Sequence, residues 1–222
     1  MNQNERLEEL NKLPIARFLD AIRDAFQRHK RVVIAAPTGS GKSTVIPLLL
    51  AKEWLPAWGR TGRVVVVEPR RIAATSLAAR VAELWGVRLG DQVGYVIRHD
   101  RRDSNATRLL YVTDGVIGRW LDSDPLLEGT DAVILDEFHE RRTETDVALG
   151  RLLLANQKRQ RMGLPPHPPG RLLGHHRGPE GVGVRPRPLL GSGRVSDPRD
   201  ARRRDHPQRP VSRGGPIHRR RR

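Results

Sequence analysis

No cysteine occurs among the 222 residues, so neither a disulfide nor a thiolate metal site can form. The eight histidines lack the spacing of metal ligands. No apolar run approaches the roughly 20 residues that a membrane-spanning helix needs. The first dozen residues are polar and carry charges of both signs, unlike a secretory leader. We therefore expect a cytoplasmic protein with no membrane partner.

Lysine and regular apolar patterning are missing from the last part of the chain. Residues 162–222 contain 15 Arg, no Lys and four acids, and they carry +11 of the net charge of +16. The same 61 residues include 11 Pro and 10 Gly, with no apolar periodicity long enough for a helix or a core strand. Such a segment cannot bury enough apolar surface to offset its ordering entropy. We predict one domain over residues 1–161 and a disordered tail over 162–222.

A glycine-rich loop, Ala36 to Thr44, follows the apolar run at 32–35. A backbone that wraps phosphate oxygens needs glycine where a side chain would collide, and Gly39 and Gly41 meet that need. Lys42 would supply positive charge to the β- and γ-phosphates, and Ser43 a hydroxyl for Mg²⁺. The predicted ATP-binding residues are Pro37, Thr38, Gly39, Ser40, Gly41, Lys42, Ser43 and Thr44.

Two carboxylates, Asp136 and Glu137, follow a second apolar run at 132–135. This pattern places an acid at the carboxyl end of a sheet strand. Asp136 would hold Mg²⁺ together with Ser43, and Glu137 would orient or deprotonate the attacking water. The alternative is an acidic turn after a buried strand with no catalytic role. Because the acidic motif occurs together with the glycine-rich loop upstream, we favour a catalytic set of Lys42, Asp136 and Glu137.

Strand-like and helix-like patterns alternate over residues 1–161. Strands are predicted at 31–35, 64–68, 93–97, 109–112 and 132–135. An amphipathic helix is predicted over 14–29, and others begin at Lys42, span 71–84 and run through 147–154. Pro47 should kink or shorten the second of these helices. The alternation predicts an α/β fold with a mainly parallel sheet and helices on both faces.

Several motifs in a fixed order resemble one family. Besides the loop and the acids, they are Glu68-Pro69-Arg70-Arg71-Ile72-Ala73-Ala74, Thr113-Asp114-Gly115 and the extension of the acidic motif to Arg142. Over about residues 12–160, the chain resembles the first RecA-like domain of DEAH-box helicases of superfamily 2, most of all the bacterial HrpB type. The resemblance implies a RecA-like P-loop NTPase domain with ATP and Mg²⁺ as cofactors.

The same resemblance implies a nucleic-acid partner, by family single-stranded RNA. It assigns Arg70, Arg71 and Thr113 to the phosphate backbone of the strand, and His139 to coupling between the nucleotide and strand sites. Arginine forks at the carboxyl end of a strand suit phosphate, although Arg70 and Arg71 could simply open a helix and face solvent. The sequence itself does not distinguish RNA from DNA and names no protein partner.

Three functions fit these residues. The first is an ATP-dependent helicase domain, here a fragment that lacks the family's second RecA-like domain. The second is a module that binds ATP and nucleic acid without significant turnover, because arginine fingers are absent and their loss costs on the order of a thousandfold. The third is a P-loop ATPase unrelated to nucleic acid.

The tail lacks the Ser-Ala-Thr motif that the resemblance places on the strand after the last helix. Shifting the reading frame forward by one base permits Ser across Leu173–Gly174 and Ala across Gly174–His175, and it requires Ile or Thr across His175–His176. The junctions from Pro169 to Leu172 permit Leu-Val-Val, a buried-strand pattern. We interpret the tail as a frame-shifted reading of a helicase gene; an authentic disordered basic tail is the alternative.

Overall fold

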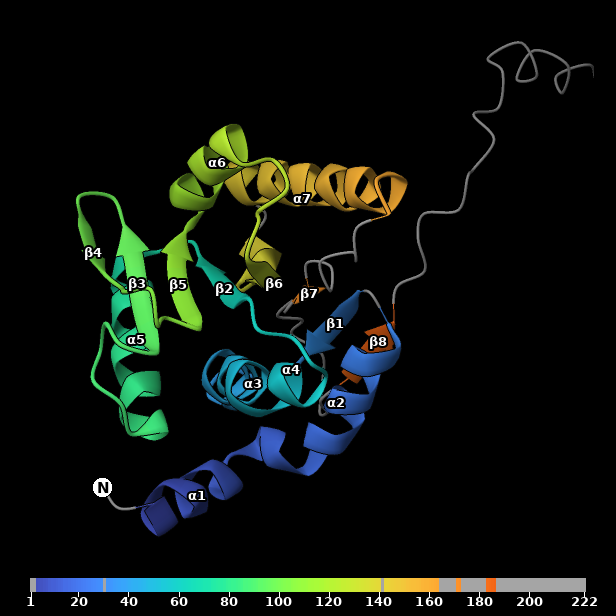
Figure 1. The fold of residues 1–222 in the computed structure, drawn as a ribbon. Coiled ribbons are helices and arrows are strands. Elements are labelled where there is room, and N and C mark those ends of the chain that lie inside the picture. Colours follow the sequence, from blue (N-terminus) through green and yellow to red (C-terminus); the bar gives the residue numbers. More distant parts are fainter. Residues whose placement is uncertain (1–2, 30, 141, 164–170, 173–182, 187–222) are drawn as a thin grey trace, which may run out of the picture. The chain divides into compact units, whose positions relative to one another are not determined.

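A computed structural model of the protein describes residues 3–29, 31–140, 142–163, 171–172 and 183–186, all within one compact unit. Its six-stranded sheet has the order β4-β3-β5-β2-β6-β7 (Figure 1). The strands are β2 (Arg63–Glu68), β3 (Val93–Ile97), β4 (Asp100–Arg102), β5 (Leu109–Thr113), β6 (Thr130–Leu135) and β7 (Arg171–Leu172). Each neighbouring pair is parallel except β3 with β4, so the predicted mainly parallel sheet is confirmed.

Helices cover both faces of this sheet, which is why consecutive residues in the middle of the central strands, such as 64–67 of β2, are apolar. Val64 and Val66 of β2 pack into the cluster that includes α2 (Leu19–Arg28), α3 (Lys42–Leu49) and α5 (Arg71–Trp85). Val65 and Val67 pack into the opposite cluster with α6 (Asp114–Ser123) and α7 (Thr143–Arg161), which lie together in Figure 1. None of the helices in the described residues is long and apolar enough to cross a membrane.

The helix predicted over 14–29 is divided in two. A 3₁₀ turn, η1 (Pro14–Phe18), precedes α2, and a further helix, α1 (Gln3–Lys12), was not predicted. Ile22 and Phe26 of the predicted apolar face are buried, and so is Ile15, which was not part of that prediction. The N–H of Ile15 donates to the carbonyl of Ser40 at 3.1 Å, so the turn is tied to the glycine-rich loop.

The helix after the loop continues past Pro47. α3 changes at Leu50 into a π-helical turn, η2 (Leu50–Trp54), and then into α4 (Leu55–Ala57). Proline has no N–H, so the carbonyl of Ser43 loses its usual donor four residues later. The hydroxyl of the buried Tyr111 on β5 donates to that carbonyl instead, at 2.9 Å. This bond joins the start of α3 to the sheet.

Strand pairing at the loop differs from the prediction. We expected the first strand in the parallel sheet, but β1 (Val32–Ala35) pairs antiparallel with β8 (Gly183–Pro186) in a separate two-stranded sheet. β7 lies between β6 and β1 and contacts both (Figure 1).

β7 and β8 both lie within the segment 162–222, for which the sequence predicts disorder. Main-chain groups form the pairing, so it needs no apolar periodicity. The rest of the predicted tail, from residue 164 onward, lies outside the described residues.

Candidate functional site

Two glycines shape the loop between β1 and α3. Gly39 and Gly41 have φ of 76° and 91°, a left-handed conformation that other residues seldom adopt. A Cβ at Gly41 would lie 2.8 Å from Cδ1 of Leu13, so the packing also requires glycine there. Gly41 is the N-cap of α3, and the helix begins at Lys42. The N–H groups at this helix start are suited to bind an anion.

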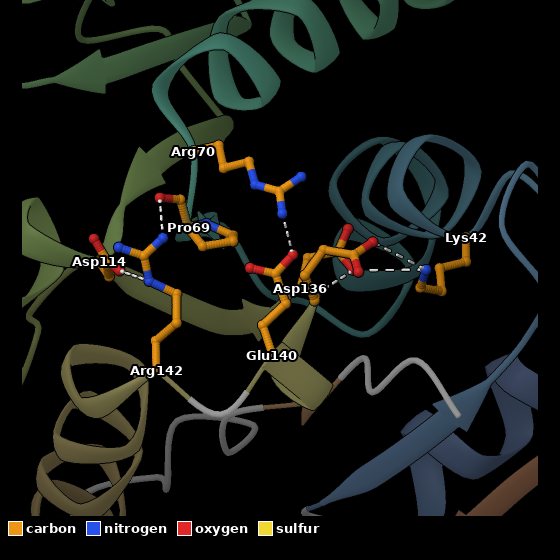
Figure 2. Close-up of polar contacts among 8 residues, drawn as sticks. Lys42, Pro69, Arg70, Asp114, Asp136, Glu140 and Arg142 are labelled. Atoms are coloured by element: carbon orange, nitrogen blue, oxygen red, sulfur yellow. Dashed lines mark hydrogen bonds and ion pairs between the residues drawn. The ribbon is translucent and has the colours of Figure 1, made fainter. Parts of the chain in front are cut away.

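Lys42 joins the loop to the acids after β6. Its side chain is 4% exposed, and Nζ lies 3.8 Å from Oδ1 of Asp136 and 3.8 Å from Oε1 of Glu137. In Figure 2 the lysine reaches across from α3 toward Asp136. The structure therefore brings together all three residues of the predicted catalytic set. Their charges are partly compensated before any ligand binds.

Asp136 is buried where β6 ends, and its main-chain N–H donates to the carbonyl of Val67 on β2 at 3.0 Å. Oδ1 accepts the N–H of Glu137 at 2.8 Å, while Oδ2 has no hydrogen-bond partner among the described residues. Glu137 has φ of 47°, a strained value for a residue with a side chain. Mg²⁺ prefers oxygen ligands, and Oδ2 of Asp136 is one of the kind that it binds.

Glu68 ends β2, the strand beside β6, and is buried. Burial, and then the negative charge of Asp136, raise the pKa of Glu68 to about 10. Glu68 is therefore neutral at pH 7, which avoids a second buried negative charge beside that of Asp136. Sequence reasoning did not select Glu68 as a site residue. Like Asp136, Glu68 directly follows an apolar run, at 64–67, and this pattern could have indicated an acid at the carboxyl end of a strand.

A cavity of about 270 Å³ adjoins the loop. Besides loop residues, its walls are Leu77, Arg80 and Leu84 of α5, with Leu13 and Glu9 from the N-terminal segment. Arg80 forms an ion pair with Glu9 of α1. The spacing of 77, 80 and 84 is that of one helix face, so a helical pattern could have indicated these residues. Sequence reasoning had left the walls of this cavity unassigned.

The predicted nucleic-acid residues differ in exposure. Arg70 is the exposed N-cap of α5, and its Nη2 lies 2.6 Å from Oε1 of Glu140 (Figure 2). Arg71 opens α5 and is exposed. Thr113 is the N-cap of α6 but is only 7% exposed. The side chain of His139 lies outside the described residues.

Arg142, which was not assigned a role, connects the turns that follow three neighbouring strands. Its Nη1 donates to the carbonyl of Pro69 at 3.2 Å, after β2. Its Nε lies 3.4 Å from Oδ2 of Asp114, after β5 (Figure 2). Asp114 also accepts the N–H of Gly115 at 2.8 Å. The turn after β6 is thereby held against the turns that carry Arg70 and Thr113.

Comparison with known proteins gives one family. The protein-family model described as "DEAD/DEAH box helicase" matches residues 19–164. The chain is 43% identical over 148 residues to the ATP-dependent RNA helicase HrpB of Escherichia coli K12, covering 67% of this chain and 18% of that protein. It is 44% identical over 154 residues to the human "Probable ATP-dependent RNA helicase DHX35", covering 68% of this chain and 22% of that protein.

Solved structures give the same result. A crystal structure of the Escherichia coli DEAH/RHA helicase HrpB is similar with a TM-score of 0.64 and 40% sequence identity. The match covers 77% of this chain and 20% of that one. The chain thus spans about a fifth of the length of the curated relatives that it matches.

Proposed function

The chain belongs to the DEAD/DEAH box helicase family, and from this premise we propose that residues 1–161 bind ATP and couple its hydrolysis to binding of single-stranded RNA. The position of Lys42 between Asp136 and Glu137 is the observation that carries the proposal. ATP dependence and RNA are named for the relatives. For this chain both are proposals, as is its location in the cytoplasm.

The loop and the two acids would divide the chemistry. The phosphates would bind the N–H groups at residues 39–44, with Lys42 leaving its carboxylate partners to contact the β- and γ-oxygens. Glu137, no longer facing Lys42, would orient the attacking water. Ser43 and the unpartnered Oδ2 of Asp136 would hold Mg²⁺, which neutralises charge that develops on the phosphate oxygens.

The nucleoside would extend toward the cavity beside the loop. Leu77 and Leu84 give that cavity apolar walls, and Arg80 supplies a planar guanidinium able to stack on a base. Arg80 would then exchange its partner Glu9 for the nucleotide. This placement keeps the phosphates on the loop and the base against α5.

The strand would bind at the turns after β2 and β5. Arg70 and Arg71 are exposed there, and their forks match phosphate oxygens. Arg70 would leave Glu140 to do so. Glu140 belongs to the same short turn as Glu137, so strand binding and the water-orienting acid share one segment. His139 in this turn stays a prediction as the coupling residue, and Thr113 as a backbone contact.

The decisive experiment is the rate of ATP hydrolysis with and without single-stranded RNA. For this chain, Glu137→Gln should abolish RNA-stimulated turnover while leaving ATP binding intact, because the acid acts on water and not on the phosphates. Glu144→Gln, on the first turn of α7, is the matched control. Tight ATP binding without turnover in the unmodified chain would favour the alternative, a binding module without significant turnover. An ATP hydrolysis rate that is the same with and without RNA would contradict the proposal that the chain couples hydrolysis to nucleic-acid binding.

We also propose that the residues after about 162 are a frame-shifted reading of a helicase gene. After α7, a parallel fold needs a buried strand beside β6. Among the described residues, the two of β7 pair there with Ile134 and Leu135. Arginine is rare in buried parallel strands, whereas the shifted frame permits Val-Val across the junctions that involve residues 170–172.

The coding DNA tests this second proposal. The shifted frame should stay open from about codon 162 and read Ser-Ala-Thr over the junctions from Leu173 onward. An early stop codon, or different codons there, would contradict it. Restoring the frame should also raise the thermal stability of the domain, because a full apolar strand would then cover the open side of β6.

A further inference from the structure

A second hollow, of about 440 Å³, lies at the amino-terminal ends of the strands. Arg63, which begins β2, and Thr130, which begins β6, are part of its wall. The ATP site is at the other end of the same strands, where Glu68 and Asp136 lie. With about 3.3 Å per residue, the length of β2 separates the two by roughly 17 Å. No role has been assigned to this hollow so far.

Positive charge dominates the hollow. Arg60, Arg63, Arg108 and Arg159 contribute to its wall, and Asp131 is the only acid among the described residues that line it. Asp131 already accepts the N–H of Gly62, and its Oδ1 lies 3.6 Å from Nη1 of Arg60. Arg63 and Arg108 thus have no carboxylate among the described lining residues to oppose their charge. Gathering like charges in one hollow is unfavourable unless an anion joins them.

Arg108 is held in place by main-chain carbonyls. It donates to the carbonyls of Thr61 and Arg60, and Arg159, on the same wall, donates to the carbonyl of Leu126 at 3.3 Å. Carbonyl partners fix a guanidinium but leave its full charge available. The Arg63 side chain has neither a hydrogen bond nor an ion pair within the described part of the chain. Its donors are therefore available to a ligand.

We propose that this hollow binds the phosphate groups of a multivalent anion, with Arg63 and Arg108 as the main contacts. Guanidinium forks bind phosphate oxygens in pairs, and an arginine that is already held, as Arg108 is, loses little entropy when it does so. Inorganic pyrophosphate and the backbone of a nucleic-acid strand present the same chemistry. The site is independent of the ATP loop, so the proposal does not rest on the function proposed above.

Titration with pyrophosphate, followed by NMR at the main-chain amides of Gly62 and Gly129, tests the proposal. All measurements use the full chain with Lys42→Ala, so that the glycine-rich loop competes less for pyrophosphate. If the alanine variant does not fold, Lys42→Met is used in its place. Both glycine signals should shift saturably. Arg63→Gln should weaken the response about tenfold. Arg119→Gln, an exposed arginine of α6, should change it less than twofold.

The second arm uses a ten-nucleotide single-stranded RNA. Shifts of the same two signals, reversed by pyrophosphate, would support the site and identify a strand as its natural source of phosphate. Shifts with pyrophosphate alone would support a small anion. Signals that do not move with either probe, or that weaken equally in Arg63→Gln and Arg119→Gln, would overturn the proposal.

Discussion

The two ends of the central sheet use arginine and lysine in opposite ways. At the carboxyl end, Arg70 faces Glu140, Arg142 faces Asp114, and Lys42 lies between two acids. At the amino end, four arginines and one acid, Asp131, are among the described residues that line the hollow, and Asp131 pairs with Arg60. The same strands, β2, β5 and β6, supply both ends.

This difference predicts two kinds of binding. A phosphate at the carboxyl end must displace an existing partner, and the displaced acid becomes available for another task. Lys42 and Arg70 both release acids of one short turn, Glu137 and Glu140, so ligands at the two positions should affect each other reciprocally. A phosphate that binds Arg63 at the amino end displaces no acid, so its binding need not change the affinity of the sites at the carboxyl end. The buried pair of Lys42 with Asp136 also implies that removing either of these two residues is costly.

The largest expected effect concerns Glu68 and pH. Its folded-state pKa of about 10 exceeds the ordinary 4.5, so the folded state holds a proton that the unfolded state loses as pH rises. The free energy of unfolding should therefore fall between pH 5 and 8, by up to about 1.4 kcal/mol per unit from this group. Glu68→Gln cannot ionise and should remove that slope. Urea unfolding at pH 5, 6.5 and 8 measures it; parallel curves for the two proteins would contradict the neutral Glu68.

The second-largest effect is expected for Lys42→Ala, on the affinity for ATP. It removes the cation that the loop offers to phosphate, at a cost of about 3 kcal/mol, or roughly 150-fold in ATP affinity. Fluorescence titration with a labelled ATP analogue measures the loss, and circular dichroism checks the fold. Lys52→Ala, at an exposed position of η2, should leave the affinity unchanged. A loss below about threefold would mean that phosphate does not bind at Lys42.

A smaller effect is expected at Tyr111. Tyr111→Phe leaves the carbonyl of Ser43 without a donor, because Pro47 cannot supply one, and should cost about 1–2 kcal/mol of unfolding free energy. Tyr95→Phe is the matched control: its hydroxyl bonds Asp100 at the exposed end of the sheet, where water can replace it. Urea midpoints of the two variants should differ. Equal losses would show that the Ser43 carbonyl finds another partner.

Local sequence was sufficient for the strands and for the loop. The apolar runs at 64–68 and 93–97 match β2 and β3 closely, because burial on both faces requires such runs. The glycines of the loop and Asp136 were predictable because each directly follows a strand. The partner of β1 was not, since β8 lies in a segment with no apolar pattern and pairs through its main chain.

The missed site residues share another cause. Glu68, Arg80 and Arg142 matter because of which strands and helices are neighbours, and strand order is not written in any local pattern. Glu68 meets Asp136 because β2 lies beside β6, and Arg142 reaches Asp114 because β5 lies beside β2. The arginine hollow was hidden for the same reason. Its members come from four separate parts of the sequence, each ordinary by itself.

The smallest effects compare the two ends of the sheet directly. Arg142→Gln should lower the free energy of unfolding by about 1 kcal/mol, because it separates Asp114 from its partner and frees the carbonyl of Pro69. Arg63→Gln breaks no such contact and relieves repulsion, so stability should stay within about 0.5 kcal/mol and tend upward at low salt. Urea unfolding at 0.05 M and 0.5 M NaCl measures both, and the gain at Arg63 should vanish at the higher concentration. A destabilised Arg63→Gln at both concentrations would show that this arginine has a structural partner, and the contrast between the two ends would then fail.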